Sequence, residues 1–287
     1  MAVTPTDSRR ATPSPMTIAG LAAFVLAYAF LVAAGDTEIV RSADPGASGV
    51  SLWAVALPPL AALALARLVT PAREVPSPLA ALPETRVRRE AWTLVAAALL
   101  LALVLPLGDV LYLPAKLLLL LAVPLLAFRL TRGDGHRART FPAPVTWIAP
   151  LPAVLAWFVL SQVWPFASPL TQDLPDPVTL AVASLVTFLT ASVLEEVFYR
   201  SWLQTRLEVL YGRWPAIMAS ALLFALMHSA RIEAGAPLHG LAAIVANQGL
   251  FGLMLGYLWA RYRNLWVIVL VHTVTNLVYV PMLIERL

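Results

Sequence analysis

Nine long apolar runs divide this chain, and they constrain its fold more than any other feature. A helix needs about 20 apolar residues to cross the ~30 Å hydrocarbon core of a bilayer. The sequence of 287 residues is 60% hydrophobic and only 13% charged, whereas soluble chains contain about 25% charged residues. The pattern therefore predicts an all-α fold, a polytopic bundle of eight or nine transmembrane helices in a lipid bilayer. The runs lie at 16–34, 50–70, 91–107, 110–128, 145–164, 178–203, 214–229, 239–260 and 265–284.

The basic residues mark one side of this predicted bundle. They precede the first run and then gather in alternate connections, while acidic residues gather in the connections between. By the positive-inside rule the N-terminus is cytoplasmic and the C-terminus lies outside. The expected location is a bacterial cytoplasmic membrane. The net charge of +4 is spread between apolar runs, so it does not indicate a nucleic-acid partner. Three arginines go against the pattern: Arg41, Arg231 and Arg286.

The chain divides into three predicted parts. Residues 1–15 are polar and are interpreted as a disordered cytoplasmic N-terminus. Residues 16–176 hold helices to which the sequence assigns no role, and residues 177–287 form the core helices that contain most of the ionisable residues inside apolar runs. The first run exceeds the ~7–15 residues of a signal-peptide core, so we interpret it as an uncleaved span. Asp176 followed by Pro177 predicts the start of the sixth helix, as an N-cap before a first-turn proline.

Ionisable residues inside the apolar runs are the main functional signal. Each costs about 2.5–3.5 kcal/mol on insertion scales, and such residues usually mark function. Most of them lie in the last third of the chain, where members four residues apart share one helix face. Counting ~1.5 Å per residue from the span ends puts them near the middle of the bilayer. They form three short patterns: Glu195 to Arg200 (EEVFYR), Phe224 to His228 (FALMH) and His272 to Asn276 (HTVTN).

These side chains form a complete set for hydrolysis of a carbonyl compound such as a peptide bond. A carboxylate acts as general base on water, and a histidine holds that water or carries its proton. A histidine and an asparagine donate hydrogen bonds to the developing oxyanion. A metal-dependent alternative stays open, because Glu195, His228 and His272 also make a three-ligand zinc pattern. The chain has no cysteine, which excludes disulfides and thiolate chemistry.

The three patterns resemble the motifs EExxxR, FxxxH and HxxxN/D of the CPBP family, the CAAX proteases and bacteriocin-processing enzymes, also called Abi proteins. They occur in this order over roughly residues 178–284. The resemblance implies an intramembrane endopeptidase of the glutamic type, with a membrane protein or peptide as substrate and no cofactor. In that scheme Glu195 and His228 activate the water, and His272 and Asn276 form the oxyanion hole. The supporting residues in this scheme are Glu196, Arg200 and Phe224.

Other interpretations of the same residues stay open. Glu196 and Arg200 could form only a structural ion pair. The protein could also be a non-enzymatic transporter, an immunity or scaffold protein on the same fold, or a zinc-dependent version of the protease. The sequence Gly-Ala-Ser-Gly at 46–49 matches the GxSG of rhomboids. It has no partner histidine in the usual later helix, so we interpret it as a turn.

A few further residues are interpreted as packing or interface groups. Gly252 and Gly256 have the GxxxG spacing that predicts a close helix–helix contact. Asn247 and Gln248 are interpreted as polar packing groups in the same run. Lys116 lies near the outer end of the fourth run and is predicted to extend its ammonium to the membrane interface.

Overall fold

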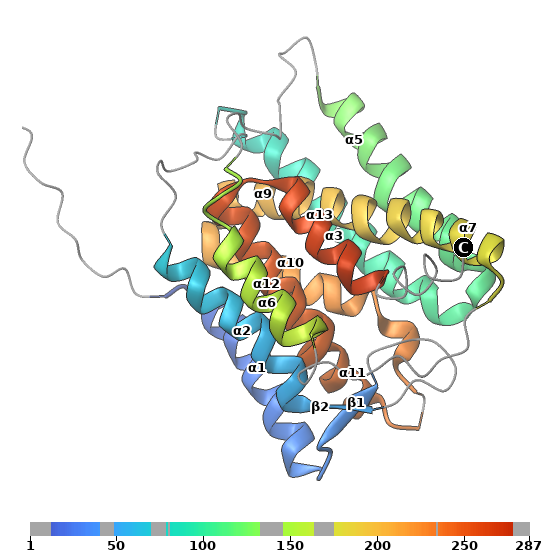
Figure 1. The fold of residues 1–287 in the computed structure, drawn as a ribbon. Coiled ribbons are helices and arrows are strands. Elements are labelled where there is room, and N and C mark those ends of the chain that lie inside the picture. The colour runs from blue at the N-terminus through green and yellow to red at the C-terminus, as the bar shows by residue number, and fades with distance from the viewer. Residues whose placement is uncertain are drawn as a thin grey trace, which may run out of the picture.

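A computed structural model describes residues 13–40, 49–69, 79, 81–132, 146–163, 175–233 and 235–277. These residues form a helical bundle with one short β-hairpin (Figure 1). The α-helices are α1 (Pro15–Ala33), α2 (Leu52–Leu68), α3 (Glu84–Val104), α4 (Tyr112–Lys116), α5 (Val123–Thr131), α6 (Leu151–Gln162), α7 (Pro177–Thr187), α8 (Leu194–Glu196), α9 (Thr205–Tyr211), α10 (Arg213–Leu226), α11 (Pro237–Ile244), α12 (Leu250–Tyr262) and α13 (Leu265–Asn276). The 3₁₀ turns are η1 (Leu105–Leu107), η2 (Asp109–Leu111) and η6 (Ser229–Arg231), and the π-helical segments are η3 (Leu117–Ala122), η4 (Phe188–Val193), η5 (Val197–Gln204) and η7 (Val245–Gly249). The hairpin pairs β1 (Glu38–Val40) with β2 (Gly49–Ser51) in antiparallel fashion.

Five helical stretches of the described residues are long and apolar enough to cross a membrane. Shorter apolar helices account for the remaining predicted runs, so every run of the sequence contains a helix. The chain is therefore an all-helical integral membrane protein, as predicted. The five long stretches are Pro15–Ala33, Glu84–Leu107, Tyr112–Thr131, Pro177–Tyr211 and Pro237–Tyr262, and the shorter helices are Leu52–Leu68, Leu151–Gln162, Arg213–Leu226 and Leu265–Asn276.

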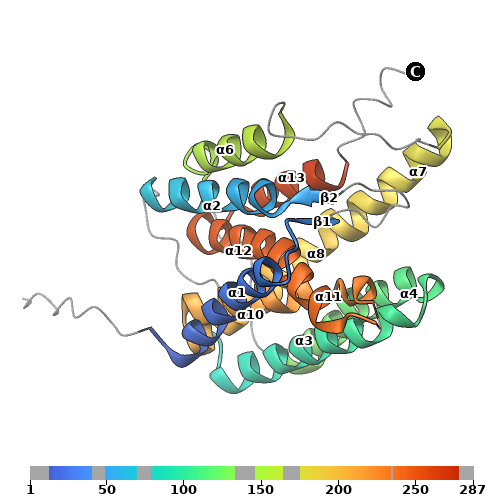
Figure 2. The ribbon, with the colours of Figure 1, turned by 90° about the horizontal axis from the view of Figure 1, so that it is seen from below.

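Helices α10 and α12 pack against each other in the middle of the bundle. One apolar cluster joins α8 and α10 to α3 and η3, and a second joins α12 and α13 to α2 and α6. A third cluster joins α1 to α10 and α11. Figure 2 shows α2 and α6 on one side of α12, with α3 and α4 on the other side. The helices before residue 177 therefore pack on two sides of α10 and α12.

Helix α7 begins where the sequence predicts, because Asp176 caps it. Its Oδ1 accepts hydrogen bonds from the backbone N–H groups of Val178 at 3.1 Å and Thr179 at 3.0 Å. Pro177 occupies the first turn, where its missing N–H costs nothing. Hydrogen bonds from Thr179 and Val178 also hold the pKa of the Asp176 carboxyl below its usual value.

Two helices begin before their apolar runs. The first helix starts at Pro15 with Ser14 as its cap, one residue before its run; of the segment 1–15 that is predicted to be disordered, residues 1–12 lie outside the described residues. Helix α3 begins at Glu84, seven residues before the apolar run. Arg86 pairs with Glu90 at 2.9 Å one turn later, and such i, i+4 pairs extend a helix beyond its apolar part.

The GxxxG pair makes the predicted close contact. Arg200 Nη2 donates to the Gly252 carbonyl oxygen at 3.3 Å, and Gln204 Nε2 donates to the Gly256 carbonyl oxygen at 2.8 Å. A Cβ on Gly256 would lie 2.7 Å from Gln204 Oε1. The two glycines therefore let polar side chains of η5 reach the backbone of α12.

The β-hairpin was not predicted, and it alters the start of the second run. Strand β2 precedes α2, with Ile39 paired to Val50 across the hairpin. His239 Nε2 of α11 lies 3.1 Å from Asp36 Oδ2 just before β1. The turn predicted at 46–49 lies outside the described residues except for Gly49, which is in β2.

Candidate active site

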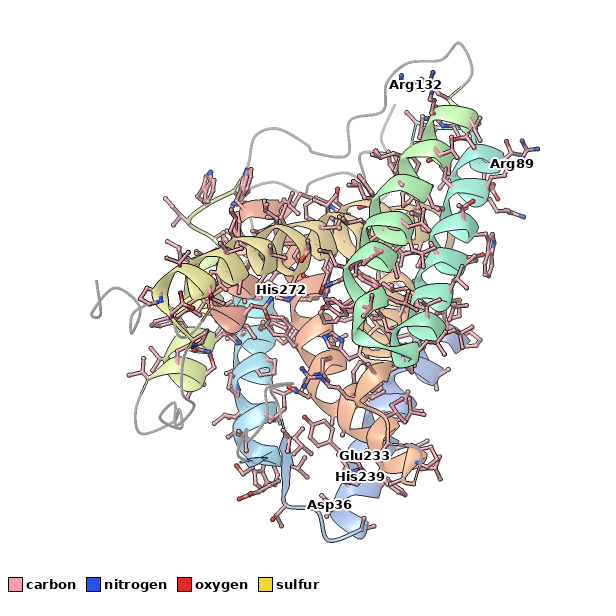
Figure 3. The ribbon with its side chains drawn as sticks, turned by 90° about the vertical axis from the view of Figure 1, so that its right-hand side faces the viewer. Asp36, Arg89, Arg132, Glu233, His239 and His272 are labelled. Atoms are coloured by element: carbon pink, nitrogen blue, oxygen red, sulfur yellow. The ribbon has the colours of Figure 1, made fainter. Side chains whose placement is uncertain are left out.

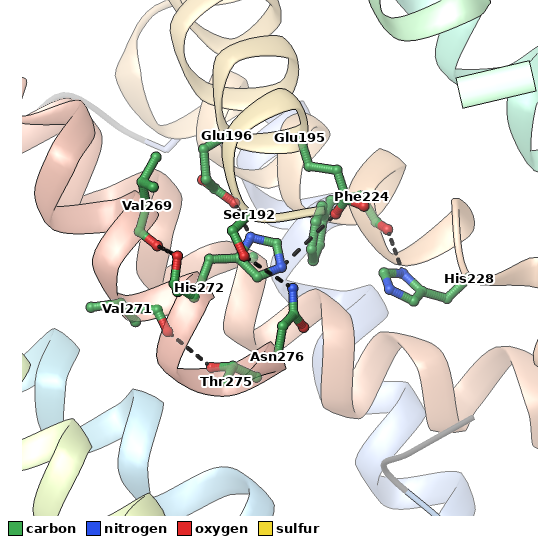
Figure 4. A network of polar contacts seen from close by, with 12 residues as sticks. Ser192, Glu195, Glu196, Phe224, His228, Val269, Val271, His272, Thr275 and Asn276 are labelled. Atoms are coloured by element: carbon green, nitrogen blue, oxygen red, sulfur yellow. Dashed lines mark hydrogen bonds and ion pairs between the residues drawn. The ribbon is translucent and has the colours of Figure 1, made fainter. Parts of the chain in front are cut away.

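Three parts of the fold bring the predicted site residues together in the interior of the bundle (Figure 4). Glu195 and Glu196 end α8, His272 lies in α13, and Phe224 lies in the last turn of α10. Glu195, Glu196 and His272 are 2%, 0% and 4% exposed. The π-helical segments η4 and η5 flank the glutamates. Such π-helical turns are rare in proteins, and those that occur are frequently at functional sites.

Glu196 joins the two sides of the cluster. Its Oε1 accepts a hydrogen bond from His272 Nδ1 at 2.6 Å, and its Oε2 lies 3.3 Å from Arg200 Nε. Arg200 lies one turn later, in the adjoining segment η5, as the i, i+4 spacing predicts. Glu196 therefore fixes the His272 ring, so that Nε2 is the nitrogen left to act.

Glu195 has a partner that the sequence did not reveal. Its Oε1 accepts a hydrogen bond from Lys116 Nζ, and its Oε2 lies 3.9 Å from His272 Nε2. Lys116 is completely buried, so the prediction that its ammonium reaches the interface is wrong. The lysine side chain points inward because the buried Glu195 carboxylate of α8 lies beside it. Its position inside an apolar run was the signal that could have identified it.

Phe224 packs among the charged groups of the site. Its ring centroid is 5.8 Å from that of His272 and 5.3 Å from that of His228, both edge-on. The Arg200 guanidinium carbon lies 4.4 Å from the same centroid, a distance suited to a cation–π interaction. The Phe224 ring therefore packs against Arg200 and against both histidines.

His228 is closer to a helix end than the sequence predicts. Helix α10 stops at Leu226, and His228 follows it in a turn, where it is partly buried. Its Nδ1 lies 3.1 Å from the Phe224 carbonyl oxygen. A carbonyl only accepts, so Nδ1 carries the proton and Nε2 is left as an acceptor.

Asn276 is the last residue of α13 and is also partly buried. Its Nδ2 donates to Ser192 Oγ at 3.4 Å. Ser192 is fully buried in η4 and was not singled out from the sequence. Within the described residues, neither Asn276 nor His228 hydrogen bonds directly to Glu195.

The charges of the cluster balance. Two adjacent carboxylates are expensive to bury unless each has its own cation. Here Arg200 lies beside Glu196, and Lys116 lies beside Glu195. The two cations come from different segments, Lys116 from α4 and Arg200 from η5. When His272 is neutral, the two glutamates and the two cations together have no net charge.

The alternative zinc site would use Glu195, His228 and His272 as its ligands. Among the residues that the structure describes, no group of three or more histidine, aspartate or glutamate side chains could hold a metal ion. The Lys116 ammonium occupies one oxygen of Glu195. A dication would have to compete with a fixed positive charge at this carboxylate.

Fold and site together define a class, an integral membrane protein with a buried cluster of ionisable side chains between its helices. Residues 177–278 match the family model described as type II CAAX prenyl endopeptidase Rce1-like. This match confirms the resemblance to the CAAX proteases that the motifs in this part of the chain predict. The match includes all three motifs and ends before the last residues of the chain. No curated protein and no solved structure matches the chain.

Proposed function

We propose that the chain is an intramembrane endopeptidase of the glutamic type, with residues 177–287 as its catalytic part. One observation carries the proposal: Glu195 Oε2 and His272 Nε2 lie 3.9 Å apart in the interior of an apolar bundle. The family supports it, because its name describes prenyl endopeptidases. The substrate class is a membrane-associated protein or peptide, with prenylated C-termini as the first candidates.

Glu195 serves as the general base through Oε2. It takes a proton from a water molecule as the water oxygen bonds to the scissile carbonyl carbon. His228 Nε2 accepts a hydrogen bond from the same water and orients it. When the tetrahedral intermediate collapses, the carbon–nitrogen bond breaks and the leaving amine takes the proton from Glu195. No covalent intermediate with the protein is required.

His272 and Asn276 stabilise the oxyanion in this scheme. His272 is fixed by Glu196 at Nδ1, so its Nε2 faces the reacting centre. Because Nδ1 already donates a hydrogen bond to Glu196, Nε2 donates to the oxyanion from a ring that is protonated at both nitrogens. Asn276 Nδ2 has only the weak 3.4 Å bond to Ser192 and can turn to the substrate. Removing one oxyanion donor typically lowers the rate about 10²–10³-fold.

The substitution Glu195→Gln tests the proposal, because glutamine keeps the shape and removes the base. Membrane vesicles with the wild-type chain and with Glu195→Gln are compared for membrane-protein fragments, and a quenched farnesylated CAAX peptide is a second substrate. We expect the variant to fold and to lose cleavage by at least about 100-fold. Cleavage at the wild-type rate by Glu195→Gln would show that the mechanism is wrong.

Two other functions give different results in the same experiment. A zinc-dependent protease would lose activity with a chelator and regain it with Zn²⁺, whereas we expect no effect of chelation, because no cofactor takes part. A non-enzymatic transporter or scaffold protein would give identical fragments with and without Glu195. The positive charge at Glu195 is the observation that disfavours the zinc version.

We also propose nine membrane spans with a cytoplasmic N-terminus, in a bacterial cytoplasmic membrane. Arg89 and Arg132 lie at one end of the bundle, whereas Asp36, Glu233 and His239 lie at the other end (Figure 3). This separation of basic from acidic residues supports the orientation that the positive-inside rule predicts.

A further inference from the structure

Lys116 is a buried cation in the part of the chain that lies before the family match. It ends α4, at the junction with η3, and its side chain is 0% exposed. Its Nζ donates to Glu195 Oε1 and to the hydroxyl oxygen of Tyr112 at 2.8 Å. The two residues of the ion pair are 79 positions apart in the sequence. A side chain of α4, which precedes the matched residues, therefore contacts the carboxylate that the proposed mechanism uses as its base.

The contact distinguishes the two oxygens of Glu195. Oε1 is held by an ammonium, a charge-assisted hydrogen bond that is stronger than a neutral one. Oε2 is 3.9 Å from His272 Nε2, which is too far for a direct hydrogen bond. Oε2 is therefore the oxygen that can accept a proton from water, and it faces the histidine that the mechanism assigns to the oxyanion.

Another buried ion pair among the described residues also joins two helices. Arg206 Nη2 lies 2.7 Å from Glu90 Oε2 and joins α9 to α3. Arg206 is 5% exposed and Glu90 is 0% exposed. This pair is remote from the motif side chains, so it separates the effect of losing a buried pair from an effect on catalysis.

We propose that Lys116 is a positioning residue of the active site, which holds Glu195 by Oε1 and leaves Oε2 as the base. The inference rests on the proposed function. The ammonium keeps its proton throughout; the proton of the water moves to Oε2 and then to the leaving amine. The first half of the chain is accordingly part of the active site, and the segment 177–287 alone lacks this contact.

The test measures cleavage by the full-length chain in membrane vesicles. The readout is the set of membrane-protein fragments that the wild-type chain produces and Glu195→Gln does not, normalised to folded protein from thermal unfolding. For Lys116→Met we expect a rate about 100-fold lower, the size of effect that misplacing a catalytic group produces. Once a fragment identifies the substrate, purified protein should show the loss in kcat with KM unchanged, because Lys116 does not contact substrate.

Two further variants keep the result decisive. Arg206→Met should destabilise the chain but retain the wild-type rate per folded molecule. Lys116→Arg keeps the charge with a different reach, so we expect a rate between wild type and Lys116→Met. If Lys116→Met does not fold, Lys116→Arg decides the question, and a wild-type rate for it overturns the positioning role.

The remaining outcomes separate this inference from the proposed function. Loss of cleavage in Glu195→Gln together with a wild-type rate in Lys116→Met overturns the inference alone. Fragments that are identical for the wild-type chain and Glu195→Gln overturn the proposed function, and the inference with it. Equal losses per folded molecule in Lys116→Met and Arg206→Met would mean that the loss of either buried ion pair disturbs the site, so that Lys116 has no specific positioning role, which also overturns the inference.

Discussion

Arg200 provides the most quantitative test of how the site is held together. Its side chain is fully buried, with Nε 3.3 Å from Glu196 Oε2 and Nη2 3.3 Å from the Gly252 carbonyl oxygen. In Arg200→Met, a side chain of similar apolar reach remains, while Glu196 is left buried without its cation. Removing one partner of a buried pair costs about 3–5 kcal/mol, and the lost bond to Gly252 adds about 1 kcal/mol.

We therefore expect Arg200→Met to lower the free energy of unfolding by about 3–5 kcal/mol, since these contributions overlap rather than add. The assay is reversible unfolding of the purified chain in mixed micelles, followed by far-ultraviolet circular dichroism. The matched control is the double variant Arg200→Met with Glu196→Gln, which removes the stranded charge. It should recover about 1–3 kcal/mol relative to the single variant.

Two results would refute this reasoning. A loss below about 1 kcal/mol for Arg200→Met would mean that water or another cation reaches Glu196. A double variant no more stable than Arg200→Met would mean that the cost comes from packing against Phe224 rather than from charge.

Two further predictions concern packing and orientation. Gly256→Val should cost about 1–3 kcal/mol of stability, because a Cβ there lies 2.7 Å from Gln204 Oε1. Gly235→Val is its control, since nothing lies within 4 Å of a Cβ at that position; equal unfolding free energies for the two variants would contradict the close contact. The chain contains no cysteine, so Arg89→Cys and Glu233→Cys each introduce a single thiol. A membrane-impermeant maleimide should label them from opposite sides of sealed vesicles, and labelling from the same side would refute the proposed topology.

The helices were predictable from the sequence because hydropathy reflects the solvent around them. Each apolar run contains a helix, and the capped start of α7 at Pro177 follows from local chemistry. The boundaries were less predictable, since hydropathy does not register polar residues that continue a helix. Helix α3 begins at Glu84 because charged residues pair along it, and α10 ends at Leu226 although the apolar run continues.

The site was predictable only where its contacts are local. The i, i+4 spacing predicts that Arg200 lies beside Glu196, and the structure has them 3.3 Å apart. The contacts of Ser192 with Asn276 and of Lys116 with Glu195 join distant segments. The helical periodicity of the sequence does not predict such contacts, because they depend on how whole helices pack.

The sequence by itself determined that the chain lies in a lipid bilayer, that its fold is helical, and which residue types form the candidate site. Few charges in a long apolar chain leave a bilayer as the only suitable medium, and the three motifs name the side chains. Only the tertiary structure decided which cation neutralises which carboxylate. Glu196 uses the arginine one turn away, whereas Glu195 uses Lys116, which the packing of η3 against α8 brings beside it. A buried carboxylate requires a cation, but the fold chooses from which helix that cation comes.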